Sequence, residues 1–231
     1  MKNYLVVGGS SGIGLAIVQQ LAVSGNQILV LSREPRETAS IAGVSHYSVD
    51  IGQDTPAFPN IDIPLDGLVY CPGTINLKPF SSLKDVDFLN DYQINVLGAV
   101  KTLRKYLPNL KAAGAPSVVL FSTVAASTGM AFHASVASAK GAVEGLVRSL
   151  AAEWAPDIRI NAIAPSLTNT PLAARLLANE ARVQQATERN PLRKIGQPED
   201  ISGMAAFLLS ESSRWITGQV FHIDGGMGVL K

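Results

Sequence analysis

One stretch near the start of the chain sets its architecture, and it reads Tyr4-Leu5-Val6-Val7-Gly8-Gly9-Ser10-Ser11-Gly12-Ile13-Gly14. Its first four residues are apolar or aromatic, which predicts a strand buried on both faces. Glycines follow at Gly8, Gly12 and Gly14, and the apolar spacing after them predicts a helix. Backbone N–H groups at such a helix N-terminus bind anions, and missing side chains let a pyrophosphate approach. An ordinary tight turn can carry the same glycines, but the strand–turn–helix context favours nucleotide binding.

The composition predicts a globular chain, and we expect a single domain over residues 1–231. That length fits one α/β domain or two small ones, and the 47% hydrophobic content suffices for a sizeable core. The formal net charge is +1, with both signs interspersed, which argues against nucleic acid or an anionic membrane surface as partner. No apolar run approaches the ~20 residues of a membrane span.

The chain carries one cysteine and three scattered histidines. Cys71 alone can form no internal disulfide, and His46, His133 and His222 show no ligand spacing, so we expect no metal. A strand that begins at the first residues leaves no room for a signal peptide. Together these features predict a cytoplasmic protein.

Strand and helix patterns alternate along the rest of the chain. The predicted strands after the first cover residues 27–31, 44–49, 66–70, 117–121, 158–164 and 219–223. The predicted helices after the first cover about 83–107, 135–155, 172–186 and 198–210. This alternation predicts an α/β fold: a doubly wound, parallel, seven-stranded Rossmann sheet in three α/β/α layers.

Two of the predicted segments carry further expectations. In the helix over 83–107, the apolar positions are expected to pack on the sheet: Val86, Leu89, Ile94, Val96, Val100 and Leu103. Residues 166–191 are long for a connection, so we expect a substrate lid there.

The end of the second strand bears on cofactor choice. In a dinucleotide-binding fold an acid at this place accepts from the ribose 2′-OH, whereas an Arg pairs with a 2′-phosphate. Ser32-Arg33 stands there, which favours NADP(H) over NAD. A solvated charge at a strand end is the alternative.

Two polar residues interrupt apolar helix faces. Asn95 lies within the pattern of 83–107, where a buried amide needs hydrogen-bond partners. Lys140 interrupts the apolar stripe of 135–155, and it is either snorkelling or placed for chemistry. A structural Asn95, bonded to a neighbouring carbonyl, is equally compatible with the pattern.

With these segments placed, the chain resembles the short-chain dehydrogenase/reductase family over essentially its whole length. The family's motifs recur in order: the glycine turn 8–14, the Asp50-Ile51 step, the segment 161–165 before the lid, Thr170-Pro171, and the C-terminal signature in 196–200 and 217–226. The resemblance implies a cofactor site built from Gly8, Ser10, Ser11, Gly12, Ile13, Gly14, Ser32, Arg33, Asp50, Ile51, Gly73, Lys140, Pro165, Thr168 and Thr170. In that site Asp50-Ile51 would meet the adenine, and Thr170 the nicotinamide carboxamide.

The resemblance breaks at the active site. The family uses Tyr-x-x-x-Lys, and Lys140 is in register, but Val136 stands where the tyrosine belongs. Thr123 occupies the place of the family's serine, which binds the substrate oxygen, and Asn95 that of its catalytic asparagine. Valine has no proton to give, and a missing acid lowers the rate of a carbonyl reduction by about 10²–10⁴-fold.

His133 is the best candidate for a replacement acid. It lies three residues before Val136 and seven before Lys140, spacings that share one face of a helix. Imidazoles titrate near neutrality. The enoyl-acyl-carrier reductases of the same family place their tyrosine seven residues before the lysine, which implies reduction of an activated C=C bond as an alternative to a carbonyl. A rim histidine without a chemical role is the competing interpretation.

Three functions follow from these residues. The first is an NADP(H)-dependent oxidoreductase of small carbonyl or enoyl substrates, with Asn95, Thr123, Lys140 and His133 as its catalytic set. The second is a pseudoenzyme whose cofactor-bound state is recognised by a partner. The third is non-redox chemistry of the kind seen in the family's dehalogenases, which Lys140 and the intact glycine turn disfavour. The family's habit of pairing its long helices implies a homodimer or homotetramer.

Overall fold

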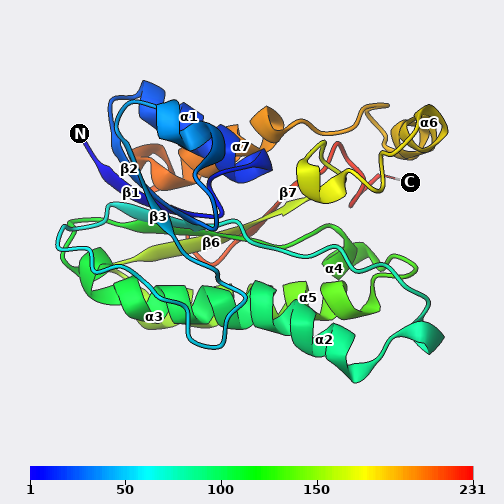
Figure 1. The fold of residues 1–231 in the computed structure, drawn as a ribbon, viewed down its shortest axis with the longest axis horizontal. Helices are drawn as coiled ribbons and strands as arrows, with labels where there is room; N and C mark the ends of the chain where they lie inside the picture. Colours follow the sequence, from blue (N-terminus) through cyan, green and yellow to red (C-terminus); the bar gives the residue numbers. More distant parts are fainter. Residues whose placement is uncertain (231) are drawn as a thin grey trace.

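Seven parallel strands form one sheet in the order β3-β2-β1-β4-β5-β6-β7 in the computed structural model, which describes residues 1–230 (Figure 1). The strand order reverses between β1 and β4, which both pair with their neighbours in parallel. The predicted doubly wound sheet is therefore confirmed. The strands are β1 (Asn3–Val7), β2 (Gln27–Ser32), β3 (Val44–Ser48), β4 (Gly67–Tyr70), β5 (Ser117–Phe121), β6 (Arg159–Pro165) and β7 (Val220–Ile223).

Helices cover both faces of the sheet. On one face lie α1 (Gly12–Val23) and α7 (Pro198–Leu209), which pack against each other; on the other lie α3 (Gly98–Lys111) and α5 (Ala134–Trp154) (Figure 1). Shorter helices are α2 (Asp85–Tyr92), α4 (Ala125–Thr128) and α6 (Glu180–Arg189). No helix in the described residues is both long and apolar enough to cross a membrane.

The interior strand β1 is buried on both faces, as its sequence predicts. Leu5 and Val7 belong to the apolar cluster under α3 and α5, whereas Tyr4 and Val6 belong to the cluster under α1 and α7. The alternation follows from the two-residue period of a strand. Because β1 packs in both cores, its position is fixed, and so is the position of the glycine turn that follows it.

The segment predicted as one helix over 83–107 contains a wide turn. The chain passes from α2 through a π-helical turn, Gln93–Leu97, into α3. Within this turn the Asn95 side-chain Nδ2 donates to the Asp91 carbonyl oxygen at 2.7 Å. A side chain that competes for the carbonyl four residues earlier opens the helical ladder, and π-turns of this kind cluster at functional sites.

The expectation that Val86 and Leu89 pack on the sheet is wrong. Their exposed fractions are 52% and 67%, and α2 lies along α5 rather than under the sheet (Figure 1). The extra residue in the π-turn rotates α2 relative to α3, so the apolar faces of the two helices do not continue one another.

The lid also differs from its predicted outline. The predicted helix 172–186 is replaced by a single 3-10 turn, Pro171–Ala173, and by α6, which begins only at Glu180. Asn179 sets that start, because its side-chain oxygen accepts a hydrogen bond from the Arg182 N–H at 3.0 Å.

The close packing of β4 gives a stability prediction. A Cβ at Gly67 would lie 2.7 Å from Leu209 Cδ2 and 2.9 Å from Tyr4 Cδ1, so Gly67→Ala should cost about 1–3 kcal/mol of unfolding free energy. Urea unfolding measures it. Gly203→Ala in α7 is the matched control: its Cβ would meet nothing within 4 Å, and alanine favours a helix. Equal unfolding midpoints for the two variants would contradict this packing.

Candidate active site

A cavity of about 460 Å³ opens at the carboxyl ends of the strands. This is where a doubly wound sheet binds its ligands, beside the reversal of strand order. Residues from the glycine turn, from the segment after β4, from β5 and β6, from α5 and from the lid meet there. The predicted site residues among its lining are Ile13, Gly73, Thr123, His133, Lys140, Pro165, Thr168 and Thr170, and Val136 lies with them.

The glycine turn has the geometry of an anion cradle. Gly8 and Gly12 have φ values of +74° and +53°, a region that favours glycine. A Cβ at Gly14 would overlap the Gly8 carbonyl oxygen, so α1 starts directly against the end of β1. Ser11, the N-cap of α1, makes no side-chain cap hydrogen bond, which leaves the first N–H groups of the helix for a ligand. These residues fit a pyrophosphate; Ser10 lies buried behind them.

The lid begins against this turn. A Cβ at Gly12 would lie 3.1 Å from Thr170 Cγ2, so Thr170 stands next to the N-terminus of α1. Thr170 Oγ1 accepts from the Ala173 N–H at 3.3 Å, and Thr168 Oγ1 donates to the Ser166 carbonyl at 3.0 Å. The segment after Pro165 thus closes one side of the cavity.

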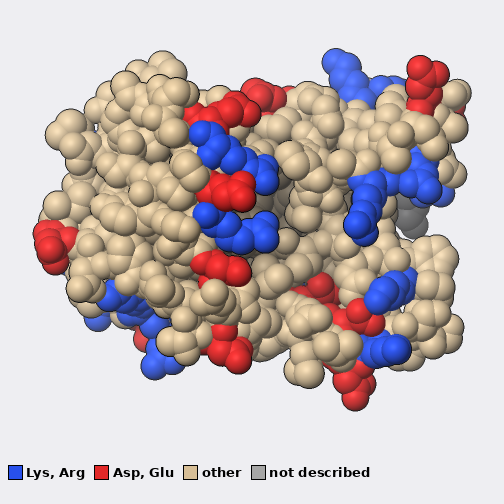
Figure 2. Space-filling view, viewed as in Figure 1, with Lys and Arg blue, Asp and Glu red and all other residues tan. Residues whose placement is uncertain are grey.

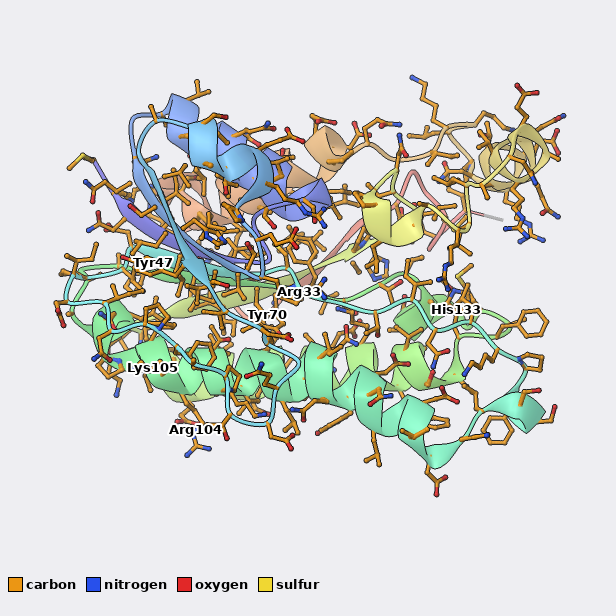
Figure 3. All side chains as sticks on the ribbon, viewed as in Figure 1. Arg33, Tyr47, Tyr70, Arg104, Lys105 and His133 are labelled. Atoms are coloured by element: carbon orange, nitrogen blue, oxygen red, sulfur yellow. The ribbon has the colours of Figure 1, made fainter. Side chains whose placement is uncertain are left out.

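At the end of β2 the two predicted residues have different surroundings. The Ser32 hydroxyl donates to the Glu34 carbonyl at 2.8 Å and lies 2.9 Å from His46 Nε2, so it is engaged within the protein. Arg33 is exposed and makes no ion pair among residues 1–230. In Figure 3, Arg33 lies near the middle of the view and His133 toward its right-hand end.

The residues after β3 form a tight turn. The Asp50 Oδ1 atom accepts from the Gly52 N–H at 2.9 Å, and Asp50 is exposed while Ile51 is buried. The turn leaves the second carboxylate oxygen of Asp50 without a partner in the described chain.

Lys140 forms the floor of the cavity. Its Nζ donates to the Phe121 carbonyl at 2.8 Å, and its exposed fraction is only 7%. Burial lowers the pKa of Lys140 to about 8, while Cys71 and Asp91 act to raise it. Burial also raises the pKa of Cys71 to about 12, so this thiol is neutral when Lys140 titrates. The Asp91 carboxylate is therefore the negative charge that stabilises the Lys140 ammonium group.

Asn95 and Asp91 form a buried polar cluster with Thr74. The Asn95 Nδ2 donates to Thr74 Oγ1 at 2.8 Å, and Thr74 Oγ1 donates to Asp91 Oδ1 at 2.6 Å. Asn95 Oδ1 and Asp91 Oδ2 have no partner within residues 1–230. A Cβ at Gly73 would lie 3.3 Å from Asn95 Oδ1 and 3.4 Å from Lys140 Nζ, so both groups lie close to the backbone at this glycine. Buried acceptors without a partner are open to a hydrogen bond from a ligand.

The two hydroxyl groups after β5, those of Ser122 and Thr123, differ in their hydrogen bonds. The Ser122 Oγ donates to Glu144 Oε1 at 2.6 Å and is thereby occupied. Thr123 Oγ1 accepts only a long hydrogen bond, 3.4 Å, from the Ala125 N–H, so its own proton is free for a ligand. Thr123 is the hydroxyl that can bind a substrate oxygen.

His133 is the N-cap of α5 and shares the cavity with Val136 and Lys140. Its Nδ1 lies 2.7 Å from the Ala131 carbonyl oxygen. Because a carbonyl only accepts, Nδ1 carries a proton in this pair, and Nε2 is the nitrogen that remains for a ligand.

Sequence reasoning missed three residues of this site. Asp91 looked like one more helix carboxylate, and only its place one turn before Asn95 could have suggested burial. Arg182 and Arg189 looked like ordinary exposed charges, yet both line the cavity. Among the described residues no group of three or more His, Cys, Asp or Glu side chains could hold a metal ion.

Comparisons with known proteins agree with this geometry. The family model described as enoyl-(acyl carrier protein) reductase matches residues 7–228. A tropinone reductase homolog of Arabidopsis thaliana is 33% identical, over 98% of this chain and 93% of its own length. A short-chain type dehydrogenase/reductase from Mycobacterium ulcerans superposes with a TM-score of 0.88 and 26% identity, covering 100% of this chain and 90% of its own. The structure of ElxO with NADP bound gives a TM-score of 0.86 and 26% identity, over 98% and 99%.

We expect Lys140 to lose its proton near pH 8 in the folded protein, because burial disfavours the charged ammonium. NMR of ¹³Cε-lysine-labelled protein measures this midpoint, and Lys140→Arg assigns the signal. Asp91→Asn should move the midpoint lower, since it removes an attractive charge. Asp157→Asn, at an exposed position after α5, should leave it unchanged. An ordinary lysine midpoint in the wild type would contradict the burial of this group.

Proposed function

Because the chain belongs to the short-chain dehydrogenase/reductase family of oxidoreductases, we propose that it is an NADP(H)-dependent enzyme that reduces a small carbonyl or enoyl substrate. One juxtaposition supports this function above all. Lys140, Thr123 and His133 line a single cavity, and Ile13 of the glycine turn lies in the same wall. Cofactor-binding and proton-donating groups therefore meet at one place.

The protein's own residues are assigned to the cofactor as follows. The N-terminus of α1 would hold the pyrophosphate, Arg33 the 2′-phosphate, Asp50 and Ile51 the adenine, and Lys140 the nicotinamide ribose. When bound, the cofactor supplies or accepts hydride. The choice of NADP(H) over NAD(H) is supported by Arg33, which makes no ion pair within residues 1–230, and by the NADP that ElxO carries.

Thr123 and His133 would act on the substrate. As a carbonyl is reduced, negative charge develops on its oxygen, and the Thr123 hydroxyl can donate a hydrogen bond to that oxygen. The proton that completes the alcohol would come from Nε2 of a protonated His133; with an enoyl substrate the same proton would complete the saturated product. Asn95 and Lys140 would connect the cavity to the buried acceptor cluster around Asp91.

Val136 is the observation that supports a cofactor-binding pseudoenzyme as the alternative function. Its exposed fraction is 5%, and its methyl groups offer no proton where the family has a phenol. A cofactor-binding pseudoenzyme would have the same cradle and the same Val136. The variants described below separate the two functions.

A homo-oligomer is also proposed. Leu89 and Tyr92 are exposed apolar residues of α2 that border a hollow, which Ser135 and Ala139 of α5 help to line. Val86 is exposed on the same helix. The family commonly pairs helices at these positions. We also propose a cytoplasmic location, which rests on the composition and the single cysteine.

We expect Arg33→Ala to raise the Kd for NADPH by about 10–100-fold, since a charge-assisted hydrogen bond to the 2′-phosphate is lost. The Kd for NADH should stay within about 2-fold, which fluorescence titration of both cofactors can measure. Arg36→Ala is the control, because Arg36 is a nearby exposed cation that lies 3.8 Å from Glu34. A loss shared equally by NADPH and NADH would contradict the assignment of Arg33.

For the proton, we expect His133→Gln to lower kcat by about 10²-fold on a panel of ketones and enoyl thioesters, with NADPH affinity unchanged. His222→Gln, which lies outside the cavity lining, should keep its activity. Adding Val136→Tyr to His133→Gln should restore turnover, because a phenol then stands at the family's position. Full activity of His133→Gln would contradict the role of the imidazole.

Val136→Tyr alone separates enzyme from pseudoenzyme. If the wild type is an enzyme, this variant keeps a similar or lower kcat. Turnover that arises only in Val136→Tyr, from a wild type that binds NADPH but reduces nothing, would establish the pseudoenzyme instead.

A further inference from the structure

One face of α6 is turned into the cavity. Its lining residues are Arg182, Gln185, Ala186 and Arg189, which are spaced three, four and seven apart and so share one side of a helix. The Asn179 cap fixes where the helix starts and hence which residues form this face. No residue of α6 is buried, so the helix is held as a cover rather than as part of the core.

The positive side chains of α6 line the cavity, and its negative side chains do not. The carboxylates of α6 are absent from the cavity lining, and Glu188 instead accepts from Gln184 Nε2 at 2.9 Å. No Asp or Glu occurs anywhere in the described lining, whereas Lys140 is at its floor and two arginines are at its cover. Figure 2 shows Lys and Arg side chains gathered over the end of the molecule that holds α6.

The two guanidinium groups have donors to spare. Arg182 Nη1 donates to the Arg175 carbonyl, which holds that side chain in place without neutralising it. Neither Arg182 nor Arg189 forms an ion pair with any residue from 1 to 230. Apolar side chains lie with them in the lining, among them Ile75, Leu77, Met130, Leu172 and Leu176. The cavity therefore has a cationic cover, an apolar wall and a hydroxyl, Thr123.

We propose that the substrate is an anion: a carbonyl or enoyl compound whose carboxylate or phosphate group is bound by Arg182 and Arg189. This inference rests on the proposed function, since it places the reducible group at Thr123. The planar fork of Arg matches carboxylate and phosphate oxygens. A substrate that carries an amine would instead meet three like charges.

Matched substrate pairs test the proposal by activity. We expect kcat/KM for levulinate to exceed that for methyl levulinate by about 10-fold or more, or that for dihydroxyacetone phosphate to exceed that for dihydroxyacetone by as much. The pair that shows the preference tells carboxylate from phosphate. The preference should shrink at high salt, because exposed charges are screened.

Variants of Arg182 and Arg189 test whether the preference for an anionic substrate comes from α6. Arg182→Gln with Arg189→Gln should lower kcat/KM for the preferred anion by about 10–100-fold and change the neutral partner's by less than about 2-fold. Lys194→Gln is the control, since it removes an exposed positive charge from the same region outside the cavity lining. Equal use of anion and neutral partner, or an unchanged preference in the double variant, would overturn the proposal.

A binding experiment tests the anion site independently of the proposed reaction. If no carbonyl compound is reduced, the NADP⁺-loaded protein is titrated calorimetrically with unreactive glutarate and with inorganic phosphate. Binding of either that is lost in the double variant but kept in Lys194→Gln supports the anion site while the proposed reaction fails. No binding of either probe to the wild type overturns the anion site itself.

Discussion

Gly14 lies so close to the carbonyl oxygen of Gly8 that no side chain fits between them. This backbone contact presses the first turn of α1 against the carboxyl end of β1, a strand with residues in both apolar cores. The unpaired N–H groups of α1 therefore open at the reversal of strand order. Thr170 of the lid and Lys140 of α5 are placed around that opening, so the geometry of the whole cavity depends on this contact.

The floor of the cavity keeps an ammonium group and lacks the family's phenol. Lys140 stays buried because the Phe121 carbonyl accepts a hydrogen bond from its Nζ and Asp91 supplies an opposing charge. Val136 leaves an apolar wall where a proton donor belongs. His133 stands at the mouth of the same cavity with one nitrogen committed to the Ala131 carbonyl and the other open. A reduction in this cavity would thus take its proton from His133, while Arg182 and Arg189 of α6 would bind the substrate.

Sequence patterns predicted the fold and the cavity's main side chains for clear reasons. Buried strands are short apolar runs, and alternation with helices makes the sheet parallel. Asn95 and Lys140 could be singled out because each interrupts an apolar helix face. The exposure of Val86 and Leu89 could not be predicted, since it depends on a π-turn that one side-chain hydrogen bond opens. The burial of Asp91 depends on the same turn, and its place one turn before Asn95 was the only signal for it. The direction of Arg182 and Arg189 depends on where Asn179 starts α6, and charged residues otherwise look like solvated ones.

Calorimetric titration of the wild-type chain with NADPH, and separately with NADP⁺, tests the cradle at Gly8–Gly14 most directly. Binding of one molecule per chain, tighter than that of NADH under the same conditions, is the predicted result. The absence of binding of both NADPH and NADP⁺ to folded protein would contradict a cofactor site at the start of α1, and with it every role assigned around the cavity.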